Sequence, residues 1–362
     1  MKRLELLDYA RHFAALMVVL FHYTFNGINN GKVYTIDFIP GLTEITKYGY
    51  LGVDLFFMIS GYVIFYSAKN RSAAKFAASR VIRLYPAYWF AVIFTATFAY
   101  FLGGESMSVN IKTVLVNLTM LQSMLGVSDV DGVYWTLIFE LKFYLLIFAL
   151  LFIGLQNQLE KIIIGWAAVI VASYFIGIGE HVYMGGYYCF FVSGALFAML
   201  KERFSFTRLI MLAALYIIGT LYMINRRELS GHGSSSESFI ILAVITIFYL
   251  FFFLQNTTTF GNLKLKGSKL AGALTYPIYL IHAHFGYMML NKFATNENKV
   301  YVYVLLIASV YLIATLIHFI IEKRLSSVWK SLFAFVIEKP VAQTQLYFDT
   351  IKHQIIKSKQ KA

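Results

Sequence analysis

Long apolar stretches separated by polar connections run along almost the whole chain. Windows of about 19 residues, the length that crosses a bilayer as a helix, identify ten such stretches. The predicted spanning helices cover residues 6–27, 48–67, 85–103, 134–155, 162–179, 181–200, 207–224, 238–255, 270–290 and 301–321. The longer polar connections cover residues 28–47, 68–84, 104–133, 225–237 and 255–269. We therefore predict an all-α fold, a polytopic transmembrane helix bundle with about ten spanning helices.

The composition excludes a soluble globular domain. Hydrophobic residues make up 59% of the chain and charged residues only 14%, whereas soluble domains are typically about 45–50% apolar and about 25% charged. No internal repeat or second soluble domain is visible. We predict a transmembrane domain over residues 1–322 and a basic cytoplasmic tail over residues 323–362. Within the tail, residues 346–356 carry several apolar side chains in a segment with lysines in and around it, which is typical of an interfacial helix.

The basic residues predict how the chain sits in the membrane. The formal net charge is +13, and 22 of the 31 basic residues fall in the connections on the side of the N-terminus or in the tail. This bias predicts an even number of helices in the cell membrane, with both termini in the cytoplasm. Because the basic residues lie between apolar segments, we expect the lipid bilayer as a partner and no nucleic acid.

A metal site is not expected. Cys189 is the only cysteine, so no multi-cysteine site can form. His282 and His284 are two residues apart and point to different faces of a helix, which disfavours a shared metal ion.

Charged groups inside spans are costly and therefore mark candidate functional sites. Arg11 and His22 are eleven residues apart in the first span, so both face the same way, separated by roughly 16 Å along the axis. Asp54 and Glu140 each lie about six residues into an inward-running span, so we expect both near the depth of His22. A carboxylate beside His22 would orient the imidazole and stabilise its protonated form, as a general base requires. The alternative is a purely structural polar network.

A cationic site is predicted at the inner surface. Arg80 and Arg83 are three residues apart and share a helix face, and with Arg11 they could bind phosphate groups. The alternative is that these arginines only orient the protein in the membrane.

Five segments in this order resemble the membrane proteins of acyltransferase family 3. They are Leu7–His22 with its Arg-x10-His pattern, Gly52–Tyr62, Arg80–Pro86 with its Arg-x-x-Arg pattern, Trp135–Glu140 and Thr275–His282. Ser60, Tyr276 and His282 fall within these segments and are further candidates. The resemblance runs from residue 6 to about 322, but Leu141 follows Glu140 where the family often has a second glutamate.

The resemblance implies transfer of an acyl group, commonly acetyl, from cytoplasmic acyl-CoA to a hydroxyl of a carbohydrate or glycolipid acceptor. It implies that Arg11 and His22 are essential, that Arg80 and Arg83 help to hold the donor, and that no cofactor is permanently bound. His22 would act as general base or, less favoured, become acylated itself, with Glu140 or Asp54 orienting it.

A transporter or flippase for a polysaccharide precursor is the alternative from another class, since polar groups at one depth also suit a substrate pathway. It would be expected to show inverted repeats and helices broken by Gly and Pro. The chain has no visible repeat and only four prolines.

Overall fold

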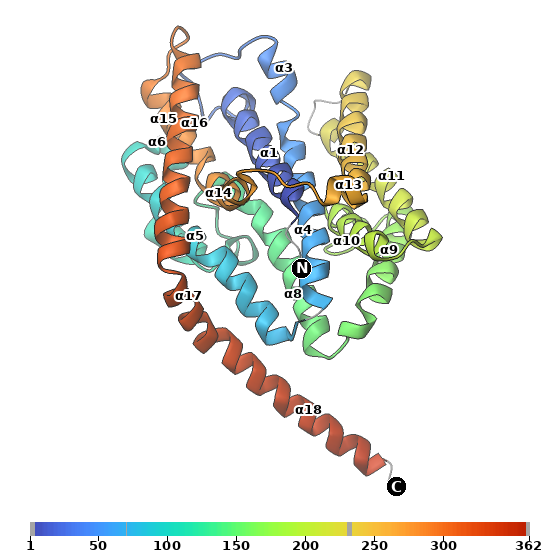
Figure 1. The fold of residues 1–362 in the computed structure, drawn as a ribbon. Coiled ribbons are helices and arrows are strands. Elements are labelled where there is room, and N and C mark those ends of the chain that lie inside the picture. The colour runs from blue at the N-terminus through green and yellow to red at the C-terminus, as the bar shows by residue number, and fades with distance from the viewer. Residues whose placement is uncertain (1–3, 70, 230–233, 360–362) are drawn as a thin grey trace.

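The fold was described from a computed structural model, which covers residues 4–69, 71–229 and 234–359. Lys2 and Arg3, part of the predicted inner basic cluster, lie outside these ranges. Every regular element within them is helical, in agreement with the predicted fold class. Figure 1 shows a bundle from which the last helix projects.

Within the described ranges, twelve α-helices of more than ten residues form the body of the bundle and its C-terminal extension. They are α1 (Glu5–Phe21), α4 (Gly52–Lys69), α5 (Ala73–Leu102), α8 (Leu137–Phe152), α9 (Leu159–Phe175), α10 (Tyr188–Glu202), α11 (Phe206–Leu229), α12 (Ser235–Asn256), α14 (Ser268–Ile281), α15 (Ala283–Phe293), α16 (Lys299–Leu316) and α18 (Lys339–Lys359), the last two joined to shorter pieces. Shorter α-helices are α2 (Gly27–Asn29), α3 (Leu42–Thr46), α6 (Gly104–Met107), α7 (Ile111–Asn117), α13 (Thr258–Gly261) and α17 (Ser326–Phe333). The 3₁₀ and π segments are η1 (His22–Asn26), η2 (Gly49–Leu51), η3 (Gln122–Leu125), η4 (Gly132–Thr136), η5 (Gln156–Gln158), η6 (Ile317–Arg324) and η7 (Ala334–Glu338).

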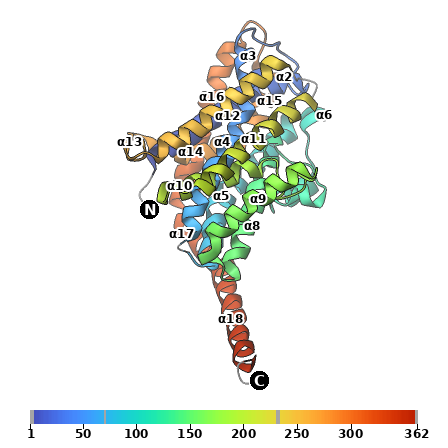
Figure 2. The same ribbon diagram turned by 90° about the vertical axis from the view of Figure 1, so that its right-hand side faces the viewer.

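The core is built on α4, which packs closely against α10. A Cβ atom on Gly61 would lie 1.9 Å from the backbone oxygen of Phe191, and one on Gly194 would lie 1.9 Å from that of Met58. Two glycines therefore let the two backbones touch, as small residues do at helix interfaces in membranes. The first helix, α1, packs between α4 and α14. Figure 2 shows α4 and α10 near the centre of the bundle and α18 projecting from it.

Seven helical stretches among the described residues are long and apolar enough to cross a bilayer, so the chain is a multi-pass membrane protein. They are Leu42–Lys69, Ala73–Leu102, Gly132–Phe152, Gln156–Phe175, Phe206–Leu229, Ser235–Asn256 and Lys299–Arg324. Among the other predicted spans, α10 has only 15 residues and is almost wholly buried between its neighbours.

The prediction of a polar connection at residues 68–84 followed by a span at 85–103 was wrong. One 30-residue helix, α5, runs from Ala73 to Leu102 and so joins most of the predicted connection to the predicted span. Its start is fixed by Ser72, whose hydroxyl accepts the Lys75 N–H, and by the alanines that follow, which favour helix. Arg80 and Arg83, two of the charges that suggested a connection, lie on the face of α5 that lines a cavity.

The predicted span at 270–290 is two helices, with the break at His282. The backbone groups at the break are bonded from elsewhere in the chain. The Tyr23 hydroxyl donates to the His282 carbonyl at 3.0 Å, and the Asp131 carboxylate accepts the His284 N–H at 3.0 Å. Asp131 also accepts the Val133 N–H at 3.2 Å, so a single side chain caps both α15 and η4.

The predicted outer connection 104–133 does not lie wholly at the surface. Val130, Asp131 and Val133 are buried, and η4 packs against α14 and α15 inside the bundle. Irregular backbone is tolerated at this depth only where protein covers it. As a result α8 begins well inside the bundle, and Glu140 lies deeper than its distance from the predicted span end suggested.

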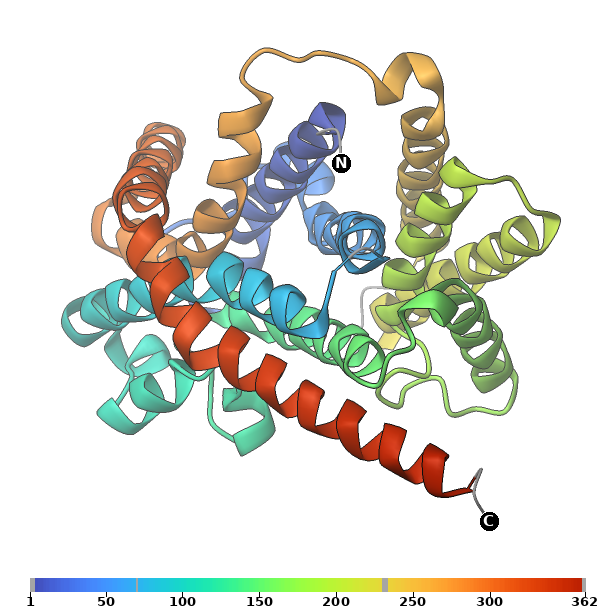
Figure 3. The same cartoon turned by 60° about the horizontal axis from the view of Figure 1, so that its bottom comes forward.

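The C-terminal helices run past α5 and the end of α8, as Figure 3 shows. The Gln345 side chain donates to the Phe152 carbonyl at 3.4 Å, and the Phe348 ring lies 5.8 Å from the Phe152 ring. Leu346 and Tyr347, between these two contacts, are exposed. Beyond Phe348, α18 extends away from the bundle.

Candidate functional site

Two cavities lie end to end in the bundle. The first, of about 400 Å³, is formed near the end of α1 that carries His22, and we call it the outer cavity. The second, of about 550 Å³, is formed nearer the start of α1 and contains Arg11, and we call it the inner cavity. Val53 and Tyr279 line both cavities and so form the wall between them. Both volumes fall within the range typical of small-ligand sites, about 300–1,000 Å³.

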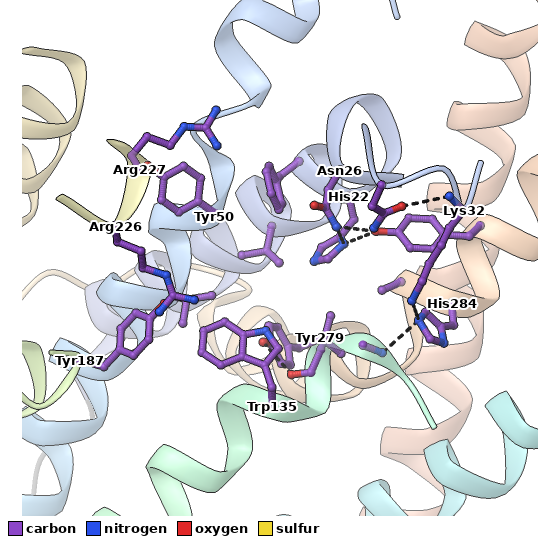
Figure 4. A pocket seen from close by; sticks show the side chains of 18 of the residues that line it. His22, Asn26, Lys32, Tyr50, Trp135, Tyr187, Arg226, Arg227, Tyr279 and His284 are labelled. Atoms are coloured by element: carbon purple, nitrogen blue, oxygen red, sulfur yellow. Dashed lines mark hydrogen bonds between the residues drawn. The ribbon is translucent and has the colours of Figure 1, made fainter. Parts of the chain in front are cut away.

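His22 is the first residue of the π segment that ends α1, and its imidazole points into the open centre of the outer cavity (Figure 4). Nδ1 lies 2.5 Å from the Tyr287 hydroxyl and 3.3 Å from the Asn26 amide nitrogen. The Asn26 amide donates to the Tyr287 oxygen at 3.0 Å. Within the described ranges no hydrogen bond reaches Nε2. In the tautomer that carries its proton on Nδ1, Nε2 is a free acceptor facing the cavity.

Both ring nitrogens of a second histidine in the outer cavity are hydrogen-bonded. His284 Nδ1 lies 3.0 Å from the Val130 carbonyl, which fixes the proton on this nitrogen. Its Nε2 then accepts the Lys32 ammonium at 2.8 Å and the Gly132 N–H at 3.3 Å. Burial lowers the pKa of Lys32, and the charge of Asp131 opposes that shift. His284 thus holds Lys32 at the cavity and has no nitrogen left for proton transfer.

Two arginines lie against aromatic rings on the opposite side of the outer cavity (Figure 4). The Arg226 guanidinium lies 5.5 Å from the centre of the Trp135 ring and 5.0 Å from that of Tyr187, and it donates to the Tyr222 hydroxyl at 3.2 Å. Arg227 lies 5.6 Å from the Tyr50 ring centre. Stacking fixes where both charges are presented.

The inner cavity brings together Arg11, Arg80 and Arg83 from α1 and α5. The Arg80 guanidinium lies 5.7 Å from the Tyr144 ring centre and that of Arg83 5.6 Å from the Tyr276 ring centre. The Arg83 guanidinium is also 4.0 Å from the Glu322 carboxylate. Glu322 accepts a hydrogen bond of 2.8 Å from His318, one helical turn before it. Three guanidinium groups at one cavity can bind a polyanion such as a phosphate cluster.

Three other residues that the sequence suggested as candidates also line the inner cavity, namely Ser60, Glu140 and Tyr276. Ser60 donates to Glu140 at 3.1 Å, and Tyr144 donates to the same carboxylate. Tyr276 donates to the Leu84 carbonyl at 3.2 Å, which anchors α14 to α5.

The expected contact between His22 and a carboxylate is absent from the described structure. Glu140 belongs to the inner cavity, because the chain re-enters the bundle before α8. Asp54 is wholly buried and lines neither cavity, and neither of its oxygens has a hydrogen-bond partner among the described residues. The partners of His22 are instead the neutral groups of Tyr287 and Asn26.

His282 lies behind His22, with the two ring centres 5.0 Å apart. Its Nδ1 lies 2.8 Å from the Tyr279 carbonyl. His282 is buried and lines neither cavity, so it is placed to pack against His22 and not to contact a ligand.

The segment after residue 322 contributes to the site. Ser326, Trp329 and Lys330 of α17 line the inner cavity. The Trp329 indole donates to the Ile321 carbonyl at 2.7 Å, which holds α17 against the end of η6. The predicted domain boundary at 322 therefore falls inside the cavity wall, and the projecting part of the tail begins with α18.

Several cavity residues were not singled out from the sequence as site residues. Asn26 is one helical turn after His22, and that spacing could have identified it. Lys32, Arg226 and Arg227 are basic residues on the predicted outer side, where such residues are few, and that exception was a usable signal. No local pattern indicated Tyr287, which meets His22 only through the fold.

Among the residues that the structure describes, no three His, Cys, Asp or Glu side chains come together in a group that could hold a metal ion. The fold and cavities define a multi-pass helical membrane protein with a cationic cavity and a histidine-containing cavity meeting inside the bundle. Residues 4–336 match the family described as "Acyltransferase domain", so the chain belongs to acyltransferase family 3. No curated protein and no solved structure matches the chain.

Family membership makes the protein a membrane acyltransferase, in agreement with the coarser part of the prediction. It favours the enzyme over the transporter or flippase considered as the alternative.

Proposed function

We propose that the protein transfers an acyl group, most simply acetyl, from cytoplasmic acyl-CoA to a hydroxyl of a carbohydrate or glycolipid on the other side of the cell membrane. Acyl-CoA is a substrate and no cofactor is permanently bound. In this proposal both termini and the inner cavity face the cytoplasm, as the distribution of basic residues predicts.

One observation carries the proposal: an arginine-lined cavity and a histidine-containing cavity share the wall formed by Val53 and Tyr279. CoA has phosphates at one end and a thioester at the end of a long flexible arm. Arg11, Arg80 and Arg83 suit the phosphates, and the arm would carry the thioester toward His22 across the shared wall. The acceptor would enter the outer cavity.

The chemistry needs one base. His22 Nε2 would take the proton from the acceptor hydroxyl while the hydroxyl oxygen attacks the thioester carbonyl. The carbon–sulfur bond then breaks, and the CoA thiolate leaves and takes the proton from His22. The Tyr287 oxygen, accepting from Nδ1–H, would keep the imidazole in the tautomer that leaves Nε2 free, and the Asn26 amide, which donates to Tyr287, would hold that hydroxyl in place.

The test supplies labelled acetyl-CoA to membrane vesicles containing the full chain and follows the label into surface glycans by mass spectrometry. His22→Gln should reduce transfer by about two to four decades, the usual contribution of a positioned acid–base group. A His22→Gln protein that is present in the membrane and transfers at the normal rate would remove His22 from the mechanism.

The donor site is tested by Arg83→Ala in the same assay. Losing a charge-assisted contact of about 1.5–3 kcal/mol should raise the KM for acetyl-CoA roughly 10- to 150-fold. Uniform loss of binding leaves kcat largely unchanged. Arg71→Ala is the matched control, because Arg71 is exposed just before α5 and lines neither cavity. Equal effects of the two variants would mean that only general surface charge matters.

A further inference from the structure

We propose that the acceptor taken by the outer cavity is an anionic saccharide, whose negative group binds Lys32, Arg226 and Arg227. This inference rests on the proposed function and assigns the chemical class of its acceptor. The negative group is a sugar carboxylate or a phosphate ester, since both suit ammonium and guanidinium donors.

The charges lining the outer cavity have one sign. Lys32, Arg226 and Arg227 all line it, and no Asp or Glu does so within the described ranges. The inner cavity differs, because Glu140 and Glu322 lie among its arginines. A ligand in the outer cavity therefore meets positive groups from two sides of His22 (Figure 4).

Acidic residues lie near these cations but do not line the cavity. Glu237 lies 3.7 Å from Arg227, and it also binds Lys47 at 3.0 Å. Asp54 interacts electrostatically with Arg226, and Asp131 with Lys32. None of these three carboxylates lines the cavity, so a ligand there meets the cations and not the carboxylates.

Aromatic side chains complete a surface suited to a sugar. Trp135, Tyr187 and Tyr50 line the cavity beside the two arginines. Flat apolar rings can cover the C–H face of a pyranose, and the amides of Asn26 and Asn30 can bond its hydroxyl groups. A simple inorganic anion would use the cations but make no use of the apolar surface that these rings add to the cavity.

Three cations on the outer side also run against the charge bias of the chain, which places most basic residues on the inner side. They therefore do not serve orientation. A binding role explains why they gather at one cavity.

The test measures binding to the purified full-length protein in nanodiscs by calorimetry, without acyl-CoA. The probes are cellobiose, cellobiouronic acid and cellobiose 1-phosphate, which share a neutral core and differ in charge. We expect at least one charged probe to bind about 10- to 150-fold tighter than cellobiose, the factor for one charge-assisted contact. Tighter binding of the carboxylate probe identifies a uronate acceptor, and tighter binding of the phosphate probe identifies a phosphorylated one.

Variants test which residues cause the preference for the charged probe. Lys32→Gln and Arg226→Gln should each reduce the preference for the charged probe about tenfold or more, and Arg226→Lys should restore part of it. Lys112→Gln, which removes an exposed cation on the same side that lines neither cavity, should leave the preference unchanged. Equal binding of charged and neutral probes by the unaltered protein overturns the inference, as does a preference that survives both Gln variants.

The result is independent of the proposed reaction. A charge preference in a protein that transfers no acyl group would keep the anionic-saccharide site but contradict the proposed function, and the saccharide would then be a ligand and not an acceptor. Acyl transfer without a charge preference would do the reverse.

Discussion

The environment of His22 shows how neutral groups can prepare a base. The Tyr287 hydroxyl bonds Nδ1, the Asn26 amide donates to the Tyr287 oxygen, and Tyr287 is itself buried. This arrangement orients the ring as a carboxylate would but adds no negative charge beside it. The pair therefore takes the place that the sequence assigned to Glu140 or Asp54.

Tyr287→Phe tests that role, since it removes one hydroxyl and keeps the ring. Losing a neutral hydrogen bond of about 0.5–1.5 kcal/mol should lower kcat for acyl transfer roughly 3- to 10-fold. The KM for acetyl-CoA should not change, because Tyr287 is not part of the inner cavity. Tyr34→Phe is the control, as Tyr34 is exposed on the same side of the protein. A kcat equal to that of the control would mean that Tyr287 does not position His22.

At the scale of elements, α4 and α14 form the wall between the cavities with one side chain each. The Tyr279 hydroxyl lies 2.7 Å from the Thr136 hydroxyl and donates to the Val133 carbonyl at 3.3 Å. The Phe56 ring packs against it with centres 5.6 Å apart. Tyr279 is therefore fixed to residues 133–136. These few contacts determine how far it closes the passage from the inner to the outer cavity.

Val53→Ala should widen this passage and let longer acyl groups react. One methylene in a fitted apolar site is worth about 1–3 kcal/mol, so the ratio of butyryl to acetyl transfer should rise by about tenfold or more. The measurement is kcat/KM for acetyl-, propionyl- and butyryl-CoA. Val63→Ala is the matched control, because Val63 lies on the same helix and lines only the inner cavity. An identical chain-length profile in both variants would show that the wall does not select the acyl group.

At the scale of the whole molecule, the two ends of α1 define two faces of the bundle. Glu5, at the start of α1, accepts the Leu265 N–H at 2.6 Å, which places the connection before α14 at that end. At the other end α3 packs against η1, and Thr43 donates to the Thr24 carbonyl at 3.2 Å. The proposed reaction requires these faces to lie on opposite sides of the membrane.

Labelling with a membrane-impermeant maleimide tests this topology. Cys189 is fully buried, so the natural chain gives an almost unlabelled background. Glu44→Cys should react in intact cells, whereas Lys264→Cys should react only after the membrane is opened. Labelling of both cysteines in intact cells would contradict the proposed orientation, and the reversed pattern would place the arginine cavity outside the cytoplasm.

The sequence by itself determined the all-α membrane fold, most of the long apolar helices and the face that Arg11 and His22 share on α1. Hydropathy and helical periodicity are local properties, so neighbouring residues suffice to fix them. The polar residues at 68–84 led to the wrong prediction of a connection there. Hydropathy does not tell whether a charged helix face meets water, lipid or a cavity.

Only the tertiary structure decided which side chains meet. His22 and Tyr287 are 265 residues apart, and they meet because the chain breaks at His282, where Tyr23 bonds the His282 carbonyl and Asp131 bonds the His284 N–H. Glu140 lies with the arginines because residues 130–136 enter the bundle under the cover of α14 and α15. Each of these outcomes depends on hydrogen bonds between distant segments, which no local pattern of hydrophobic and polar residues encodes.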